Sequence, residues 1–185
     1  MIGKWFAAIA GLAVACVAVS PAQGVVALDF VPQFTTIPNV GGTVDIDIVM
    51  DTYDTFPGQP VSILGWGLDL LYDNTKLMVT NVVIGPEWDP AFAPDGDGLA
   101  GLRFPNGISG QDILLATVTV QGLAPGVWTI ASGNSYPQDL TEGFALDPTG
   151  FEQVVLEDFA AITVLPEPTA LALLALGGLV VFRRR

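Results

Sequence analysis

Hydrophobic and polar residues alternate along most of the middle of the chain. In residues 44–51 the hydrophobic side chains face one way and the aspartates the other: Val44, Ile46, Ile48 and Met50 against Asp45, Asp47 and Asp51. Two later segments repeat the pattern: Leu64, Trp66, Leu68, Leu70 and Tyr72, then Leu114, Ala116, Val118 and Val120. A period of two residues is typical of a β-strand with one buried face. Nothing in this part of the chain has the spacing of a long helix.

Turn residues separate these segments: Pro57-Gly58, Asp73-Asn74, Asp95-Gly96, Asn106-Gly107, Pro125-Gly126 and Pro148-Thr149-Gly150. Further strands are predicted at 76–84, 98–104, 127–131, 152–157 and 160–165, with an edge strand at 25–30 and a long polar connection at 134–147. About eight or nine short strands divided by turns predict an all-β fold, an antiparallel β-sandwich or jelly roll.

The first 23 residues have the pattern of a cleavable signal peptide. Lys4 supplies the positive start, residues 5–19 the apolar stretch, and Ser20-Pro21-Ala22 the small residues of a cleavage site. We therefore expect a signal helix that is removed between Ala22 and Gln23. Val25-Val26-Ala27 is a second acceptable site, and Cys16 leaves a lipoprotein signal as an alternative.

The other end carries a short apolar segment. Residues 169–182 would form a helix of roughly 21 Å, against roughly 30 Å of bilayer hydrocarbon, and Arg183, Arg184 and Arg185 follow it. Such a short transmembrane helix is a poor permanent anchor, and its arginines are expected on the cytoplasmic side. Pro168 suits the first turn of this helix.

Pro166, Glu167 and Pro168, the apolar segment and the arginines together resemble the PEP-CTERM sorting signal of Gram-negative bacteria. The resemblance covers about the last 22 residues. It implies that an exosortase recognises the Pro-Glu-Pro motif, removes the tail in the cell envelope, and handles a protein of the exopolysaccharide or surface matrix. A simple tail anchor is the alternative. The chain thus divides into a signal peptide (1–23), a β-sandwich (24–164) and a sorting segment (165–185).

The charge of the middle domain limits its partners. The whole chain has a formal net charge of −13. Without the terminal Lys4, Arg183, Arg184, Arg185 and Glu167, 18 acids remain against Lys76 and Arg103, a net charge of −16. Such a surface repels phosphate, which argues against nucleic-acid binding and against peripheral binding to anionic lipid.

The composition also excludes several kinds of enzyme. The chain has no histidine, and its one cysteine, Cys16, lies in the signal peptide. The mature domain therefore has no Ser-His-Asp or Cys-His machinery and none of the usual zinc ligands. We expect a protein that is not an enzyme and requires no cofactor.

Short motifs in the middle domain resemble the cohesin-like fold. They are a strand that ends in Tyr72-Asp73 before a turn, Leu77 opening the next strand, and Leu115-Ala116-Thr117 in a later strand. The resemblance spans residues 45–164 and implies a single cohesin-like β-sandwich. Cohesins usually occur in tandem and capture calcium-loaded dockerins, whereas this chain has one copy and no recognisable dockerin. Related sandwiches also bind carbohydrate.

A proline-rich loop at residues 86–94 carries two aromatic residues, Trp88 and Phe92. If exposed, these rings would stack on sugar rings. The alternative is that they fold back and close one end of the sandwich, because large aromatic side chains gain so much from burial. Trp66 and Trp128 lie in apolar strands and are predicted to belong to the core.

Acidic residues suggest two further sites. Asp95 and Asp97, with glycines after each, have the spacing of a calcium loop, and Asp89 would add a ligand. Calcium needs six to eight oxygens, so an ordinary turn is the alternative. Asp45, Asp47, Asp51 and Asp54 offer carboxylate pairs roughly 7 Å apart, as a glycan hydrolase could use, or else form a solvated strand face.

These observations favour an exported protein that binds exopolysaccharide or a surface protein at the envelope, outer surface or extracellular matrix of a Gram-negative-type bacterium. It would be held transiently in the inner membrane by its tail. The alternatives are a carboxylate-dependent glycan hydrolase and a structural surface protein stabilised by calcium.

Overall fold

The computed structural model describes residues 26–52, 61–91, 99–133, 143–147, 150–152 and 159–167. This part of the chain is all-β and contains no helix. The signal peptide, Phe92, Asp95, Asp97 and residues 168–185 lie outside it.

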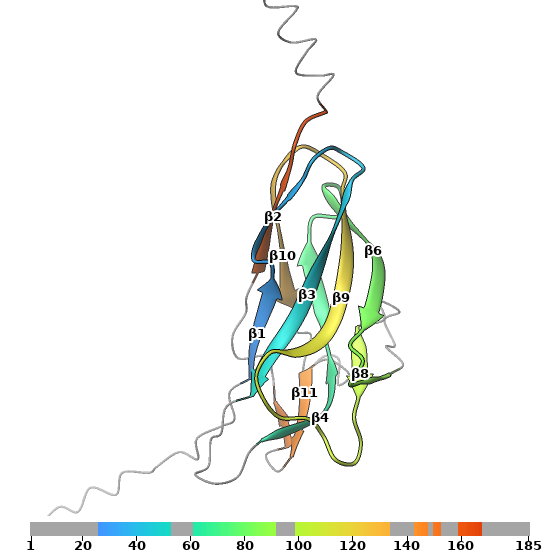
Figure 1. Ribbon diagram of the computed structural model, residues 1–185, viewed down its shortest axis with the longest axis vertical. Helices are drawn as coiled ribbons and strands as arrows, with labels where there is room; N and C mark the ends of the chain where they lie inside the picture. Colours follow the sequence, from blue (N-terminus) through green and yellow to red (C-terminus); the bar gives the residue numbers. More distant parts are fainter. Residues whose placement is uncertain are drawn as a thin grey trace, which may run out of the picture.

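One layer is a four-stranded sheet in the order β1-β3-β9-β6. Its strands are β1 (Val26–Val31), β3 (Thr43–Thr52), β9 (Ile113–Gly122) and β6 (Leu77–Ile84), and all neighbours are antiparallel. The predicted alternation in β3 is confirmed, because Ile46, Ile48 and Met50 have no exposed surface. The two central strands, β3 and β9, are ten residues long each and run side by side in Figure 1.

The second layer begins with a sheet in the order β2-β13-β10-β5. Its strands are β2 (Phe34–Ile37), β13 (Phe159–Val164), β10 (Gly126–Gly133) and β5 (Asp69–Tyr72). Only the pair β2 and β13 is parallel among the described strand pairs, so the prediction of antiparallel sheets holds for all pairs but this one.

A third sheet continues the second layer in the order β12-β11-β4-β8-β7. It consists of β12 (Gly150–Glu152), β11 (Gly143–Asp147), β4 (Ser62–Gly67), β8 (Ala100–Leu102) and β7 (Asp89–Pro90). Leu68 alone separates β4 from β5, so the single strand predicted at 64–72 is two strands. β11 lies inside the predicted connection 134–147, and that part of the prediction is wrong, because β11 pairs with β4 and β12.

Irregular pairing changes which side chains face the core. The register of β3 against β9 shifts so that Ile48 pairs with Ala116 and Val49 with Leu114. Leu115 is the extra residue and is fully buried, whereas Leu114 is only partly buried. A similar shift between β4 and β11 buries Ile63 in place of Leu64. The alternation predicted through Leu114 and Leu64 is therefore wrong at these two bulges.

The buried side chains of the three sheets form one hydrophobic core. Trp66, which is 4% exposed, belongs to it, and Trp128 packs against it, as the sequence predicted. In Figure 1 strand β1 begins in the lower half of the domain, and the orange-red end of the described chain leaves at the top.

Candidate functional site

The two outer faces of the sandwich differ in chemistry. On the β1-β3-β9-β6 sheet the outward residues of β3 are Thr43, Asp45, Asp47, Val49 and Asp51. Thr117 Oγ1 donates a hydrogen bond of 2.6 Å to Asp47, and Thr119 Oγ1 one of 2.7 Å to Asp45. Each aspartate pairs across the strands with the threonine that binds it. The geometry favours the solvated strand face over an acid pair for hydrolysis.

The outer face of the β2-β13-β10-β5 sheet is nearly free of charge. Alternation along its strands directs these residues outward: Phe34 and Thr36 from β2, Phe159, Ala161 and Thr163 from β13, Val127, Thr129, Ala131 and Gly133 from β10, and Asp69 and Leu71 from β5. We call this set the apolar face. Asp69, at its margin, is its one charged member.

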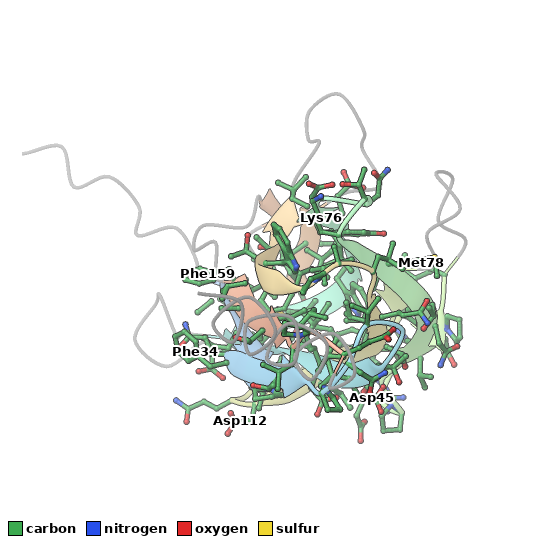
Figure 2. The ribbon with its side chains drawn as sticks, turned by 90° about the horizontal axis from the view of Figure 1, so that it is seen from above. Phe34, Asp45, Lys76, Met78, Asp112 and Phe159 are labelled. Carbon is green, nitrogen blue, oxygen red and sulfur yellow. The ribbon has the colours of Figure 1, made fainter. Side chains whose placement is uncertain are left out.

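The pairing register brings these residues into rows. Ala161 pairs with Phe34 on one side and Thr129 on the other, and Ala131 pairs with Phe159 and with Leu71. In Figure 2, Phe34 and Phe159 lie near each other on one side of the domain, and Asp45 lies on another. The rows therefore form one continuous surface across four strands.

Large apolar side chains on this face are open to solvent. Phe34 is 71% exposed, Val127 65%, Leu71 59% and Phe159 43%. Leu71 lies across Gly133, where a β-carbon would come within 2.8 Å of the leucine side chain. The apolar face has small residues at its centre and large ones around them. Such a surface suits contact with another macromolecule better than binding of a small ligand.

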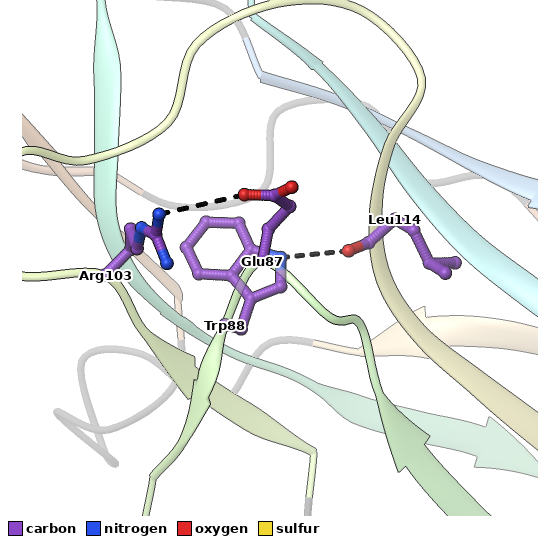
Figure 3. Close-up of polar contacts among 4 residues, drawn as sticks. All are labelled: Glu87, Trp88, Arg103 and Leu114. Carbon is purple, nitrogen blue, oxygen red and sulfur yellow. Dashed lines mark hydrogen bonds and ion pairs between the residues drawn. The ribbon is translucent and has the colours of Figure 1, made fainter.

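Trp88 is buried. Its side chain is 5% exposed, and its ring packs edge-on against Trp66, with centroids 6.1 Å apart and planes at 84°. Its indole N–H donates a hydrogen bond of 2.9 Å to the main-chain oxygen of Leu114 (Figure 3). The ring is thus not available for stacking on a sugar, and the alternative interpretation, closure of the sandwich, fits this position. Phe92 lies outside the described residues.

Glu87 and Arg103 form an ion pair of 3.8 Å beside Trp88 (Figure 3). Both side chains are substantially exposed, so this pair contributes little to stability.

The calcium and sorting residues are only partly described. Asp89 is exposed in β7, whereas Asp95 and Asp97 lie outside the described residues. Within the described ranges no group of three or more carboxylates could hold a metal ion. Pro166 and Glu167 are exposed directly after β13; Pro168, Arg183, Arg184, Arg185, Ala22 and Gln23 lie outside the described part. Where the structure describes the chain, it has no helix with the length and hydrophobicity to cross a membrane.

The apolar face was not predicted from the sequence. In β10 the outward Val127 and Ala131 alternate with the inward Trp128 and Ile130, so both sides of the strand are hydrophobic. The available signal was the lack of charged residues in 126–133 and 159–165, in a domain of high negative charge.

No protein-family model and no curated protein matches the chain. Among solved structures it is similar to a cohesin module of a family 33 glycoside hydrolase from Clostridium perfringens ATCC13124, with a TM-score of 0.56 and 8% identity over 78% of this chain and 98% of that one.

Weaker matches include the third cohesin ScaC of Acetivibrio cellulolyticus, solved in complex with the ScaB dockerin, with a TM-score of 0.48 and 14% identity over 76% of this chain and 99% of that one. Domains 4 and 5 of the S-layer protein SbsC match with a TM-score of 0.38 and 14% identity over 77% of this chain and 54% of that one. The described part of this chain therefore has a cohesin-like β-sandwich fold, as its sequence motifs predicted.

Proposed function

We propose that this protein is an exported surface module that binds a protein partner through the apolar face. The observation that carries the proposal is the exposure of Phe34, Leu71, Val127 and Phe159 on one sheet face that has a single charged residue, in an acidic domain. Contiguous exposed apolar surface is uncommon on soluble proteins, and it marks sites of association. Depletion of charge with aromatic residues retained is the composition of an interface core.

The opposite sheet face explains why association would be specific to one side. Its aspartates and hydrogen-bonded threonines keep it solvated, and outward charge discourages contact with other acidic surfaces. The complex of one cohesin with a dockerin supports a protein partner for this fold, although it does not identify the partner of this chain.

Export and sorting complete the proposal. The signal-peptide pattern of residues 1–23 directs the chain across the inner membrane, and residues 169–182 hold it there until an exosortase-type enzyme acts at Pro166, Glu167 and Pro168. The position of Pro166 and Glu167, exposed outside the last strand, is consistent with access by such an enzyme.

Two matched variants test the binding face. Val127 in β10 and Val83 in β6 are both exposed valines, at 65% and 55%, on different sheets. Immobilised wild-type domain and the variants Val127→Asp and Val83→Asp are compared for capture of envelope proteins of the source bacterium and for binding on a glycan array. We expect a defined protein that is retained by wild type and Val83→Asp and lost with Val127→Asp. Equal capture by all three, or binding to glycans alone, would overturn the proposal.

A further inference from the structure

The chain leaves the sandwich at one end, which we call the exit end. Val164, the last residue of β13, is 1% exposed, and the N–H of Leu165 donates a hydrogen bond of 2.9 Å to the oxygen of Ile37. Pro166 and Glu167 follow and are exposed. The main chain is thus hydrogen-bonded to the domain at Leu165, the first residue of the sorting segment, and it leaves at the top of Figure 1.

Three turns make up the exit end: residues 38–42, 73–76 and 123–125. Gly41 N–H donates to the oxygen of Gly122 at 2.8 Å, and Gly122 N–H donates to that of Gly42 at 3.1 Å. Leu123 N–H donates to the oxygen of Lys76 at 2.8 Å. These main-chain hydrogen bonds join the turns into one surface around the end of β13.

The exit end lacks the acidic character of the rest of the domain. Turns 38–42 and 123–125 contain no charged residue, and the third turn contributes Asp73 and Lys76, which balance each other, so that with the exposed Glu167 the described residues of this end carry a formal net charge of −1. Leu123 is 37% exposed, and Pro38 and Pro125 are exposed beside it. The average charge of the domain argues against contact with lipid, but the fold places most of that charge elsewhere.

Lys76 and Trp128 meet at this end. The ammonium group of Lys76 lies 5.5 Å from the centroid of the Trp128 ring, and Trp128 donates a hydrogen bond of 2.8 Å to the oxygen of Ala124. Lysine is one of the side chains that occupy the boundary between lipid headgroups and hydrocarbon, and the inward Trp128 ring lies beneath its ammonium group at this end. Leucine and proline in the adjoining turns add apolar surface without charge.

The chain between the sandwich and the apolar tail is short. Three residues, 165–167, separate Val164 from Pro168, so these two residues lie at most about 14 Å apart when the chain is extended. We propose that the exit end rests on the lipid surface into which residues 169–182 insert, with Leu123, Pro125 and Lys76 against the headgroups. The inference depends on the membrane insertion in the proposed function. It predicts that the sandwich stands end-on, with the apolar face perpendicular to the membrane and open to a partner.

Site-specific fluorescence quenching tests this contact. Because Cys16, the one cysteine of the chain, lies in the signal peptide, processed protein that begins at Gln23 accepts a single labelled cysteine at Asn39, in the exit end, or at Gln111, before β9 at the opposite end. The labelled proteins are reconstituted into vesicles of phosphatidylethanolamine and phosphatidylglycerol that carry headgroup spin labels. We expect the probe at position 39 to be quenched several-fold more strongly than the probe at 111. Equal quenching of protein that floats with the vesicles would overturn the inference and leave the proposed function standing. Protein that does not float with them would overturn the inference together with the membrane insertion in the proposed function.

A substitution tests whether the exit end itself contacts the lipid or is only held near it by the inserted tail. Leu123→Asp places a negative charge against the anionic headgroups and should reduce quenching at position 39. Val83→Asp, on the edge strand β6, adds the same charge away from this end and should leave quenching unchanged. Unchanged quenching in Leu123→Asp would show that only the tether brings the end near the lipid, and it would overturn the proposed contact.

Discussion

The indole nitrogen of Trp88 lies 2.9 Å from the main-chain oxygen of Leu114 and joins the segment after β6 to the bulged part of β9. Leu114 lies directly beside the extra residue of the bulge, Leu115, where the ladder to β3 is interrupted. A side-chain donor at this point satisfies a carbonyl in an irregular part of the sheet. Trp88 therefore stabilises the fold. Of the two interpretations that the sequence left open, its position fits burial in the sandwich and not stacking on a sugar ring.

Replacing Trp88 by Phe should destabilise the domain more than replacing Trp66 by Phe. Both substitutions replace a buried indole with a smaller phenyl ring, but Trp88→Phe also removes the hydrogen bond from the indole N–H to the Leu114 oxygen. Trp66 Nε1 is buried without a hydrogen-bond partner among the described residues, so Trp66→Phe removes an unsatisfied group. We expect a difference of about 1–2 kcal/mol in the free energy of unfolding, measured by urea titration. Equal losses would contradict the importance of this hydrogen bond.

Gly85, three residues before Trp88, should tolerate no side chain. Its N–H donates a hydrogen bond of 2.8 Å to the oxygen of Leu115, and a β-carbon on Gly85 would overlap the oxygen of Leu114. Since a main-chain atom cannot move aside as a side chain can, Gly85→Ala should cost at least about 2 kcal/mol of stability. Gly110→Ala is the control, because a β-carbon there meets no atom, although its positive φ of 146° adds local strain. If Gly85→Ala loses no more stability than Gly110→Ala, the close approach of Gly85 to the Leu114 oxygen is contradicted.

The pKa of Asp73 provides a test by pH. Hydrogen bonds from the hydroxyl of Thr75, at 2.6 Å, and from its N–H, at 2.9 Å, hold the pKa of the Asp73 carboxyl below its ordinary value of about 3.9. A lowered pKa in the folded state contributes stability above the unfolded pKa, and this contribution disappears as the pH falls through the folded pKa. Thr75→Val should therefore raise the pKa of Asp73, and it should be less stable than wild type at neutral pH. The pKa is measured by NMR titration and the difference in stability by unfolding at several pH values. If Thr75→Val remains equally less stable than wild type at pH values below the folded pKa, the difference in stability does not come from the ionised Asp73 carboxylate.

Removal of metal should not change thermal stability. Asp89 is exposed, and the described residues contain no group of three acids arranged to hold a cation. If residues 95–98 form an ordinary turn, the melting temperature will be the same in chelator and in calcium. Because a ligand that binds only the folded state must raise that temperature, a higher value in calcium would support the structural calcium protein instead. Asp95→Asn would then be expected to abolish the increase.

The sequence predicted β3, β10 and β13 as strands, but it predicted the outward face of a strand only where that face is polar. Asp45 and Asp47 marked the outward side of β3, and the buried Ile46 and Ile48 followed directly. In β10 no such contrast exists, so the apolar face could not be separated from the core without the pairing of Val127 with Thr163. The local pattern of residues predicts a strand. Which side of a mostly hydrophobic strand faces the core depends on the strands that pair with it.

Long-range pairing also accounts for the missed strands. β2 contains only Phe34–Ile37 and pairs in parallel with β13, more than a hundred residues later in the chain. β11 begins at Gly143 and ends at Asp147, residues that usually mark turns, and it is formed by pairing with β4. The bulges at Leu115 and Leu64 likewise depend on register, which the sequence of one strand does not contain.

Site-specific photo-crosslinking in living cells of the source bacterium tests the central claim most directly. A photoreactive residue is placed at Leu71 or Val127 on the apolar face, or at Thr119 or Val83 on the opposite sheet. Binding of a protein through the apolar face predicts the same cross-linked protein, identified by mass spectrometry, from positions 71 and 127 and none from positions 119 and 83. Cross-links of equal yield from both faces, or none from positions 71 and 127, would contradict the assignment of that face as the binding surface.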